Sequence, residues 1–219
     1  MQRILIIISL IFLSACASTP PKHPDNICQV FDEKEDWYQA AVNSEKHWGI
    51  PIPVQMAIIY QESSFVATAE PPRQLILGFI PWFRSSSAYG YPQAQDGTWK
   101  QYQQKTGHWF ADRDDFSDSC DFIGWYCSVS HKKLGLAKTD THNLYLAYHE
   151  GHGGFQRNSH SHKQWLLTTA QKVQNRARRY ETQLATCRSR LEARIREIIA
   201  IRCNRHCYRC YYRRWRFLS

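Results

Sequence analysis

The sequence contains no run of roughly 20 consecutive apolar residues, the length that a helix needs to cross a bilayer. It also lacks the alternation of apolar and polar residues that is typical of strands, and it shows no internal repeat. These absences argue against an integral membrane protein, a protein built mainly of sheets and a repeat protein. The 219 residues are 43% hydrophobic and 14% aromatic, enough for one globular core and too apolar for a wholly disordered chain.

The first residues have the pattern of a signal sequence, with an apolar run from Ile4 to Leu13 followed by small residues. The string L-S-A-C that ends at Cys16 resembles the lipobox of bacterial lipoproteins, in which the signal is removed and the cysteine is acylated. The resemblance implies a signal peptide over residues 1–15, a lipidated Cys16 and a tether over residues 16–27. Ala17 after the cysteine implies the outer membrane, with the protein facing the periplasm. The alternative is an ordinary secretory signal followed by a chance cysteine.

The C-terminal tail, residues 188–219, holds most of the net charge of +9, because it has ten arginines against two acids. Aromatic side chains alternate with the arginines, a composition that suits an anionic surface or nucleic acid. In a periplasmic lipoprotein the partner would be membrane lipid or anionic peptidoglycan, and we expect no nucleic acid. An appendage with little order and a simple continuation of the last helix are the other interpretations.

Seven cysteines remain after Cys16, so at least one is free or pairs with another chain. Cys28 lies just before the first expected helix and Cys187 near the end of the last one in the folded body, which makes them a possible disulfide on position alone. Such a bridge would stabilise the fold by about 4–5 kcal/mol in the chain-entropy model.

Two groups of residues have the side chains of a metal site. The four histidines between residues 149 and 162 are spaced poorly for zinc, and we expect no metal there and no cofactor. The three cysteines between residues 203 and 210 have the spacing of an iron–sulfur motif without the α/β barrel that it serves. A small zinc knot or disulfides remain open for them.

Residues 28–187 are expected to form a mainly α-helical domain. The apolar periodicity predicts helices over Asp36–Trp48, Val54–Tyr60, Asp140–Tyr148 and Trp165–Leu184. The stretch Val66–Ser87 contains three prolines and is expected to be an irregular insertion. It would either form a lip of a cleft, with Trp82 stacking on sugars, or pack on the body.

Glu62 is the strongest candidate for chemistry. It follows a helix that is apolar almost all round and therefore buried. Burial and the negative end of the helix dipole both disfavour the charged form of a carboxylate, so we expect its pKa to be raised. A carboxyl group that keeps its proton near neutral pH is suited to act as a general acid.

Three motifs occur in order along this domain: E-S-S-F from Glu62, G-Y-P-Q from Gly90 with a later Thr98, and A-Y-H-E-G from Ala147. Together they resemble the motifs of the soluble lytic transglycosylase (SLT) family of lysozyme-like enzymes. The resemblance covers roughly Asp36 to Leu184. One departure is His149, which stands where the family has asparagine.

The resemblance implies a lysozyme-like domain that acts on peptidoglycan glycan strands. The reaction would cleave the bond between N-acetylmuramic acid and N-acetylglucosamine with formation of a 1,6-anhydro ring, and Glu62 would be the general acid and base. A hydrolytic muramidase is the alternative if Asp96 or Glu150 supplies a second carboxylate. A catalytically weak peptidoglycan-binding or assembly lipoprotein is the other. The residues expected to bind substrate are Ser63, Tyr91, Gln93, Thr98, Tyr148 and His149.

Overall fold

The computed structural model describes residues 19–205 apart from 77–79 and 85. This part of the chain is mainly helical, as expected, and none of its helices is both long enough and apolar enough to cross a membrane. The predicted signal peptide, Cys16 and the last 14 residues of the tail lie outside the described residues. In chain order the elements are α2 (Ile27–Glu33), α3 (Glu35–Trp48), α4 (Ile52–Ser63), β1 (Arg73–Ile76), β2 (Ile80–Arg84), α5 (Asp96–Thr106), α6 (Phe116–Leu134), α7 (Thr141–Gln156) and α8 (Gln164–Arg205).

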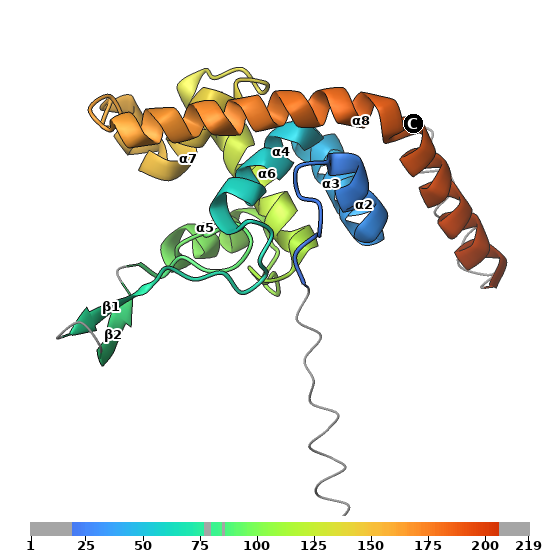
Figure 1. Cartoon of the computed structure of the whole chain (residues 1–219), viewed down its shortest axis with the longest axis horizontal. Coiled ribbons are helices and arrows are strands. Elements are labelled where there is room, and N and C mark those ends of the chain that lie inside the picture. Colours follow the sequence, from blue (N-terminus) through green and yellow to red (C-terminus); the bar gives the residue numbers. More distant parts are fainter. Residues whose placement is uncertain (1–18, 77–79, 85, 206–219) are drawn as a thin grey trace, which may run out of the picture.

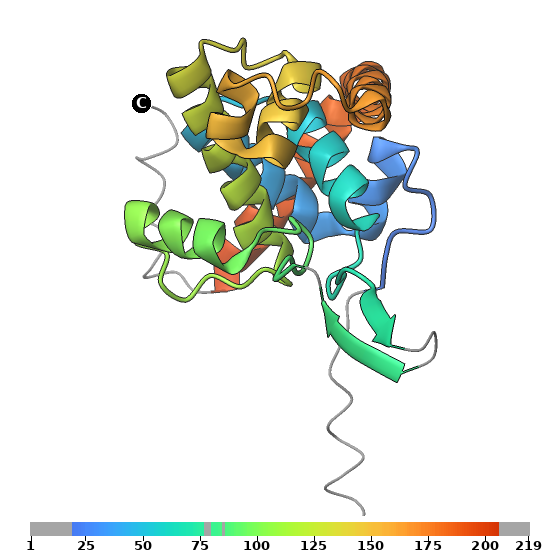
Figure 2. The ribbon, with the colours of Figure 1, turned by 90° about the vertical axis from the view of Figure 1, so that its left-hand side faces the viewer.

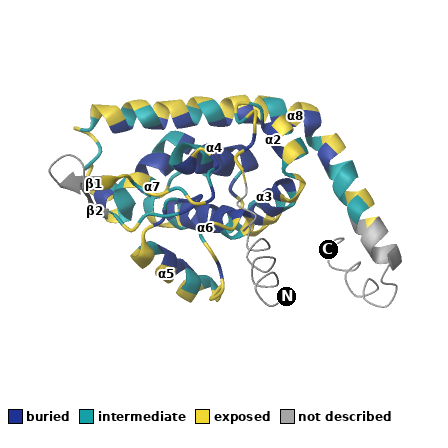
Figure 3. Cartoon of the chain, turned by 60° about the horizontal axis from the view of Figure 1, so that its bottom comes forward, coloured by how far each residue is buried: buried dark blue, intermediate teal, exposed yellow. Residues whose placement is uncertain are grey.

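Helix α4 is the centre of the core. Every residue from Ile52 to Ile59 is buried, and Figure 3 shows α4 and α6 as the most continuously buried helices. A proline in the first turn helps to start α4, because its fixed φ suits a helix and its missing N–H is not needed there. Since α3, α6 and α8 all pack against it, the position of the last turn of α4 is fixed from several sides.

Helix α8 runs along one side of the domain, as Figures 1 and 2 show from two directions. It packs on α7 and α4 and, further along, on α2. The guanidinium of Arg176 lies 3.5 Å from the centre of the Tyr60 ring in α4. The helix continues past Leu184 to Arg205, so the expected domain limit between residues 187 and 188 falls inside one helix. Beyond that limit, Arg190 and Arg194 form ion pairs with Asp32 of α2.

The segment before α2 is attached to the middle of α8. A disulfide joins Cys28 to Cys187, the pair suggested by position in the sequence. Asp25 forms ion pairs with Arg176 and Arg179 at 2.7 and 2.9 Å. The start of α2 and the residues before it are therefore held to α8 by one covalent bond and by ion pairs.

The insertion between Val66 and Ser87 was expected to be irregular, and this expectation was wrong for residues 73–76 and 80–84, which form two strands. Strands β1 and β2 form an antiparallel hairpin that projects from the helical body (Figures 1 and 2). Pro81 is tolerated within β2 because both strands of a two-stranded sheet are edge strands. The side chain of Trp82 lies outside the described residues, so both interpretations of it stay predictions.

Candidate active site

Glu62 lies in the last turn of α4, where the chain leaves the helix through an unusual turn. Ser64 and Phe65 have φ values of 51° and 62°. These values lie in the left-handed region, which residues other than glycine rarely adopt. Phe65 is completely buried, and its ring packs against those of Trp37 and Tyr60. Because core packing anchors Phe65, the turn holds Glu62 at one defined position despite the backbone strain.

The carboxyl group of Glu62 is poorly solvated. The residue as a whole is only partly buried, yet its Oε1 has no contact with solvent and no hydrogen-bond partner among the described residues. Burial raises the pKa of Glu62 to about 8, although a hydrogen bond with Tyr145 acts in the opposite direction. The direction agrees with the one expected from the sequence. Glu62 is therefore mostly protonated at neutral pH.

Two tyrosines of α7 face this carboxyl group. Tyr145 interacts with Glu62: after burial, the charge of Glu62 raises the pKa of the Tyr145 hydroxyl, and Tyr145 in turn favours the ionised form of Glu62. Burial and then the charge of Glu62 hold the pKa of Tyr148 well above its ordinary value, and its hydroxyl donates to the carbonyl oxygen of Pro92. The two side chains are three residues apart on one helix and so share a face. Tyr145 was not predicted as a site residue. Its spacing of three residues from Tyr148 could have indicated that both side chains lie on the same face of the helix.

The second motif shapes the loop opposite α7. Gly90 has a φ of 74°, and a Cβ atom there would lie 2.0 Å from the carbonyl oxygen of Arg113, so only glycine fits. Gln93 donates from Nε2 to the carbonyl oxygens of Ala69 and Gly90 at 2.8 and 2.9 Å. The amide group of Gln93 thus joins the loop after α4, at Ala69, to the loop that contains Gly90. The hydrogen bond from Tyr148 to Pro92 joins the loop that contains Gly90 to α7.

Three other residues that were expected to bind substrate lie at different depths. Tyr91 is 1% exposed and packs against Trp37 and Phe116, which places its ring in the core and does not favour contact with a substrate. Ser63 is buried and its Oγ donates to the carbonyl oxygen of Ile59 within α4. Thr98 is partly exposed in the first turn of α5.

Both candidates for a second carboxylate are engaged elsewhere. Asp96 is exposed and pairs with Arg113 at 2.8 Å. Glu150 pairs with Lys163 at 2.8 Å and accepts a hydrogen bond from Ser159. Burial opposes ionisation of Glu150, but these hydrogen bonds outweigh it and lower its pKa to about 2. Neither group is among those that shift the pKa of Glu62.

The histidine that replaces the asparagine of the third motif is exposed. The Nδ1 of His149 lies 3.1 Å from Oε1 of Glu150, and its ring packs edge-on against that of Trp165. Within the part of the chain that the structure describes, no group of three or more histidine, cysteine or acidic side chains is placed to hold a metal ion.

The sequence matches a family model described as the transglycosylase SLT domain over residues 4–187. No curated protein and no solved structure matches it. The matched region contains all three motifs and the helices that carry Glu62, Tyr145 and Tyr148. This family implies a transglycosylase that acts on peptidoglycan. Since the match spans far more than half of the sequence, the chain belongs to the transglycosylase SLT domain family.

Proposed function

We propose that the protein is a lytic transglycosylase in which Glu62 is the general acid and base. Glu62 donates its proton to the oxygen between N-acetylmuramic acid and N-acetylglucosamine, and the bond from that oxygen to C1 of the muramic acid breaks. The C6 hydroxyl oxygen of the same sugar then bonds to C1, and its proton passes to Glu62. The products are a 1,6-anhydro end and a free N-acetylglucosamine end, and the catalyst is regenerated.

The observation that carries this proposal is the buried, proton-holding carboxyl group of Glu62, together with the ion pairs that occupy Asp96 and Glu150, the two candidates for a second carboxylate. A glycosidase that uses water or an enzyme nucleophile needs two carboxyl groups on opposite sides of the scissile bond. Anhydro ring closure needs one, because the substrate supplies the attacking oxygen. The ion pairs of Asp96 and Glu150 support the one-carboxylate reaction over the muramidase alternative.

The test is the mass of the products that the protein releases from purified sacculi. We expect anhydro-muropeptides, each lighter by one water than its hydrolytic counterpart. Glu62→Gln should lower turnover about 100- to 10,000-fold, the usual contribution of a general acid and base. Asp96→Asn, at an exposed carboxylate, is the matched control and should leave product masses and rate near wild type.

Other results would replace the proposal. Hydrolytic products would identify a muramidase. Binding to sacculi without turnover would identify a wall-binding module. Near wild-type turnover by Glu62→Gln would remove Glu62 from the mechanism.

We also propose that the protein is a lipoprotein of the cell envelope, anchored through Cys16 in the outer membrane and facing the periplasm. The support is the apolar run followed by L-S-A-C at Cys16. A periplasmic position would bring the domain to peptidoglycan, which agrees with the substrate of its family. The basic tail would add contact with an anionic surface.

A further inference from the structure

An exposed indole ring lies at the beginning of α8, close to the candidate site. Trp165 is 58% exposed, one of three large hydrophobic side chains with high exposure in the described part of the chain. The other two, Trp109 and Phe110, are in the loop after α5. An exposed indole offers a large apolar face together with one polar N–H, and such a ring connected to the candidate site is a candidate contact for a ligand.

A side chain of α7 contacts the indole ring of Trp165. The ring of His149 packs edge-on against it, with centroids 5.2 Å apart. His149 is itself oriented by its contact with Glu150, whose side chain is only 5% exposed and pairs with Lys163 just before α8. The end of α7 and the residue before α8 are thus joined by an ion pair whose carboxylate is buried and whose ammonium group is partly exposed, and this pair helps to fix the surface.

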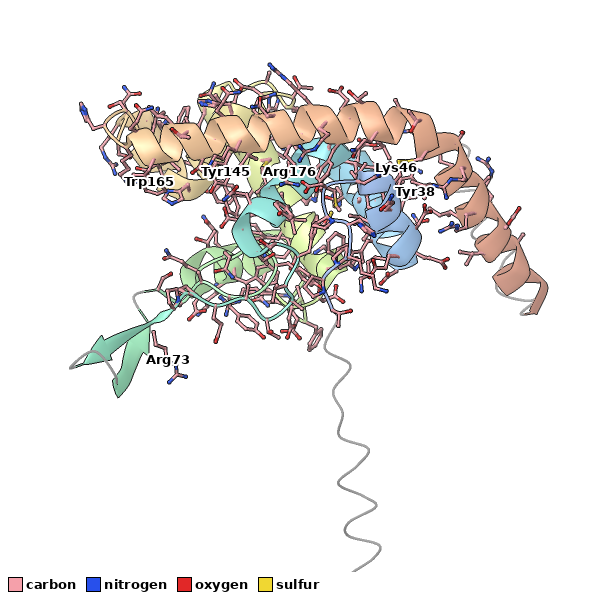
Figure 4. The ribbon with its side chains drawn as sticks, in the orientation of Figure 1. Tyr38, Lys46, Arg73, Tyr145, Trp165 and Arg176 are labelled. Carbon is pink, nitrogen blue, oxygen red and sulfur yellow. A yellow bond between two sulfur atoms is a disulfide. The ribbon has the colours of Figure 1, made fainter. Side chains whose placement is uncertain are left out.

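The same surface leads to the candidate acid. His149 lies four residues after Tyr145 on α7, and their ring centroids are 6.4 Å apart. Tyr145 in turn interacts with Glu62, whose charge adds to burial in raising the pKa of the Tyr145 hydroxyl. Figure 4 labels Trp165, at the start of α8, and Tyr145, of α7, both along the lower side of the α8 ribbon. Short ring-to-ring steps therefore connect the exposed indole to the carboxyl group.

We propose that Trp165 and His149 form a further sugar-binding subsite, which holds a ring of the glycan strand next to the sugars at Glu62. A pyranose ring has an apolar face of C–H groups that gains free energy by covering an indole, while its hydroxyl and N-acetyl groups stay in contact with water or polar side chains. His149 adds a polar ring beside the stack. Its ring contact with Trp165 also gives a reason for the departure from asparagine, which has no ring to pack there.

This inference rests on the proposed function, since it takes the glycan strand as the ligand. The occupant is a sugar rather than a peptide stem because the surface offers an exposed indole ring that ring contacts connect to Tyr145 beside Glu62. Glu150, which contacts His149, and Lys163 already neutralise each other. A charged peptide would therefore find no free ionic partner in that pair.

The test uses peptide-free probes, a short and a long β-1,4-linked oligomer of N-acetylglucosamine, titrated into the protein by calorimetry. The long oligomer should bind more tightly than the short one. Trp165→Ala should remove that difference, with a loss of roughly 5- to 30-fold for the long oligomer, as expected for truncation of a central aromatic contact. Trp165→Phe should keep part of the affinity, and His149→Asn should lose part of it. Trp109→Ala is the matched control, because Trp109 is 61% exposed but lies in the loop after α5.

Unchanged binding by Trp165→Ala, or an equal loss in Trp109→Ala, would overturn the inference. A loss seen only with peptide-bearing strands would also overturn it. Wild-type melting temperatures in all variants would exclude unfolding as the cause. Digestion of sacculi by the wild type tests the proposed function separately. If the wild type digests sacculi but binding does not depend on Trp165, only the proposed subsite is contradicted. If binding depends on Trp165 but sacculi are not digested, the subsite is supported and the proposed enzymatic function is contradicted.

Discussion

Replacing Glu62 by glutamine should stabilise the folded protein, by an amount that grows as the pH rises. The pKa of Glu62 is about 8 in the folded protein, against an ordinary value of 4.5. Between these values the folded protein keeps a proton that the unfolded chain has released. The free energy of unfolding therefore falls by about 1.4 kcal/mol per pH unit. At pH 7 the free energy of unfolding of the wild type is therefore lower by roughly 3 kcal/mol than at pH 4.5. Glutamine does not ionise, so the variant avoids this decrease.

The measurement is the free energy of unfolding by urea for wild type and variant at several pH values from 4.5 to 8. The difference between the two proteins should increase with pH through this window. The control is Glu150→Gln, the same substitution at a carboxyl whose pKa is lowered to about 2. Its ionised form stabilises the fold above the unfolded pKa of 4.5, so this variant should be less stable than wild type by a nearly constant amount across this window, and should approach wild type only as the pH falls from 4.5 towards 2. Parallel curves for Glu62→Gln and wild type would refute the claim that Glu62 is buried with a raised pKa.

Three further predictions concern the site and the anchor. Tyr145→Phe removes the hydrogen bond that favours ionised Glu62, so the alkaline limb of the pH–rate profile should move to higher pH; an unchanged profile would exclude this role. Tyr148→Phe and Gln93→Ala should each lower turnover about 10- to 1000-fold with helical circular dichroism near wild type, and full activity in both would make their motifs coincidental. Cys16→Ser should release the protein from membranes or stop its processing, as checked by fractionation at high salt and by mass, and unchanged behaviour would exclude lipidation.

The helices that could be predicted are those with a clear apolar pattern or a clear starting residue. The all-round apolar pattern indicated the burial of α4, and the helix expected to start at Asp140 is α7, where Asp140 is the N-cap and accepts from the backbone N–H of Asn143. Helix α6 was missed because its Ser, Cys and Gly residues have low helix propensity. Its formation depends on packing instead. Gly124 of α6 lies so close to α3 that a Cβ atom there would be 2.3 Å from Oγ of Ser44.

The three motifs identified only part of the candidate site. They indicated Glu62 together with the helix that buries it. They did not separate residues that face the site from those that build it, since the ring of Tyr91 is in the core and Ser63 bonds within α4. Tyr145 lies outside the three motifs and was missed, because its role depends on which face of α7 meets α4. That relation between helices is not contained in any single stretch of sequence.

The disulfide between Cys28 and Cys187 also determines how the domain bears mechanical force. With the anchor at Cys16 that we propose, a protein bound to the cell wall would be pulled between these two attachments. The ion pairs of Asp25 with α8 are non-covalent and would yield first. From Cys28 onward the tension passes through a covalent bond into the middle of α8, so α2 is not peeled from the domain. Because α8 packs on both α4 and α7, the pulling force is spread over the helices that form the site.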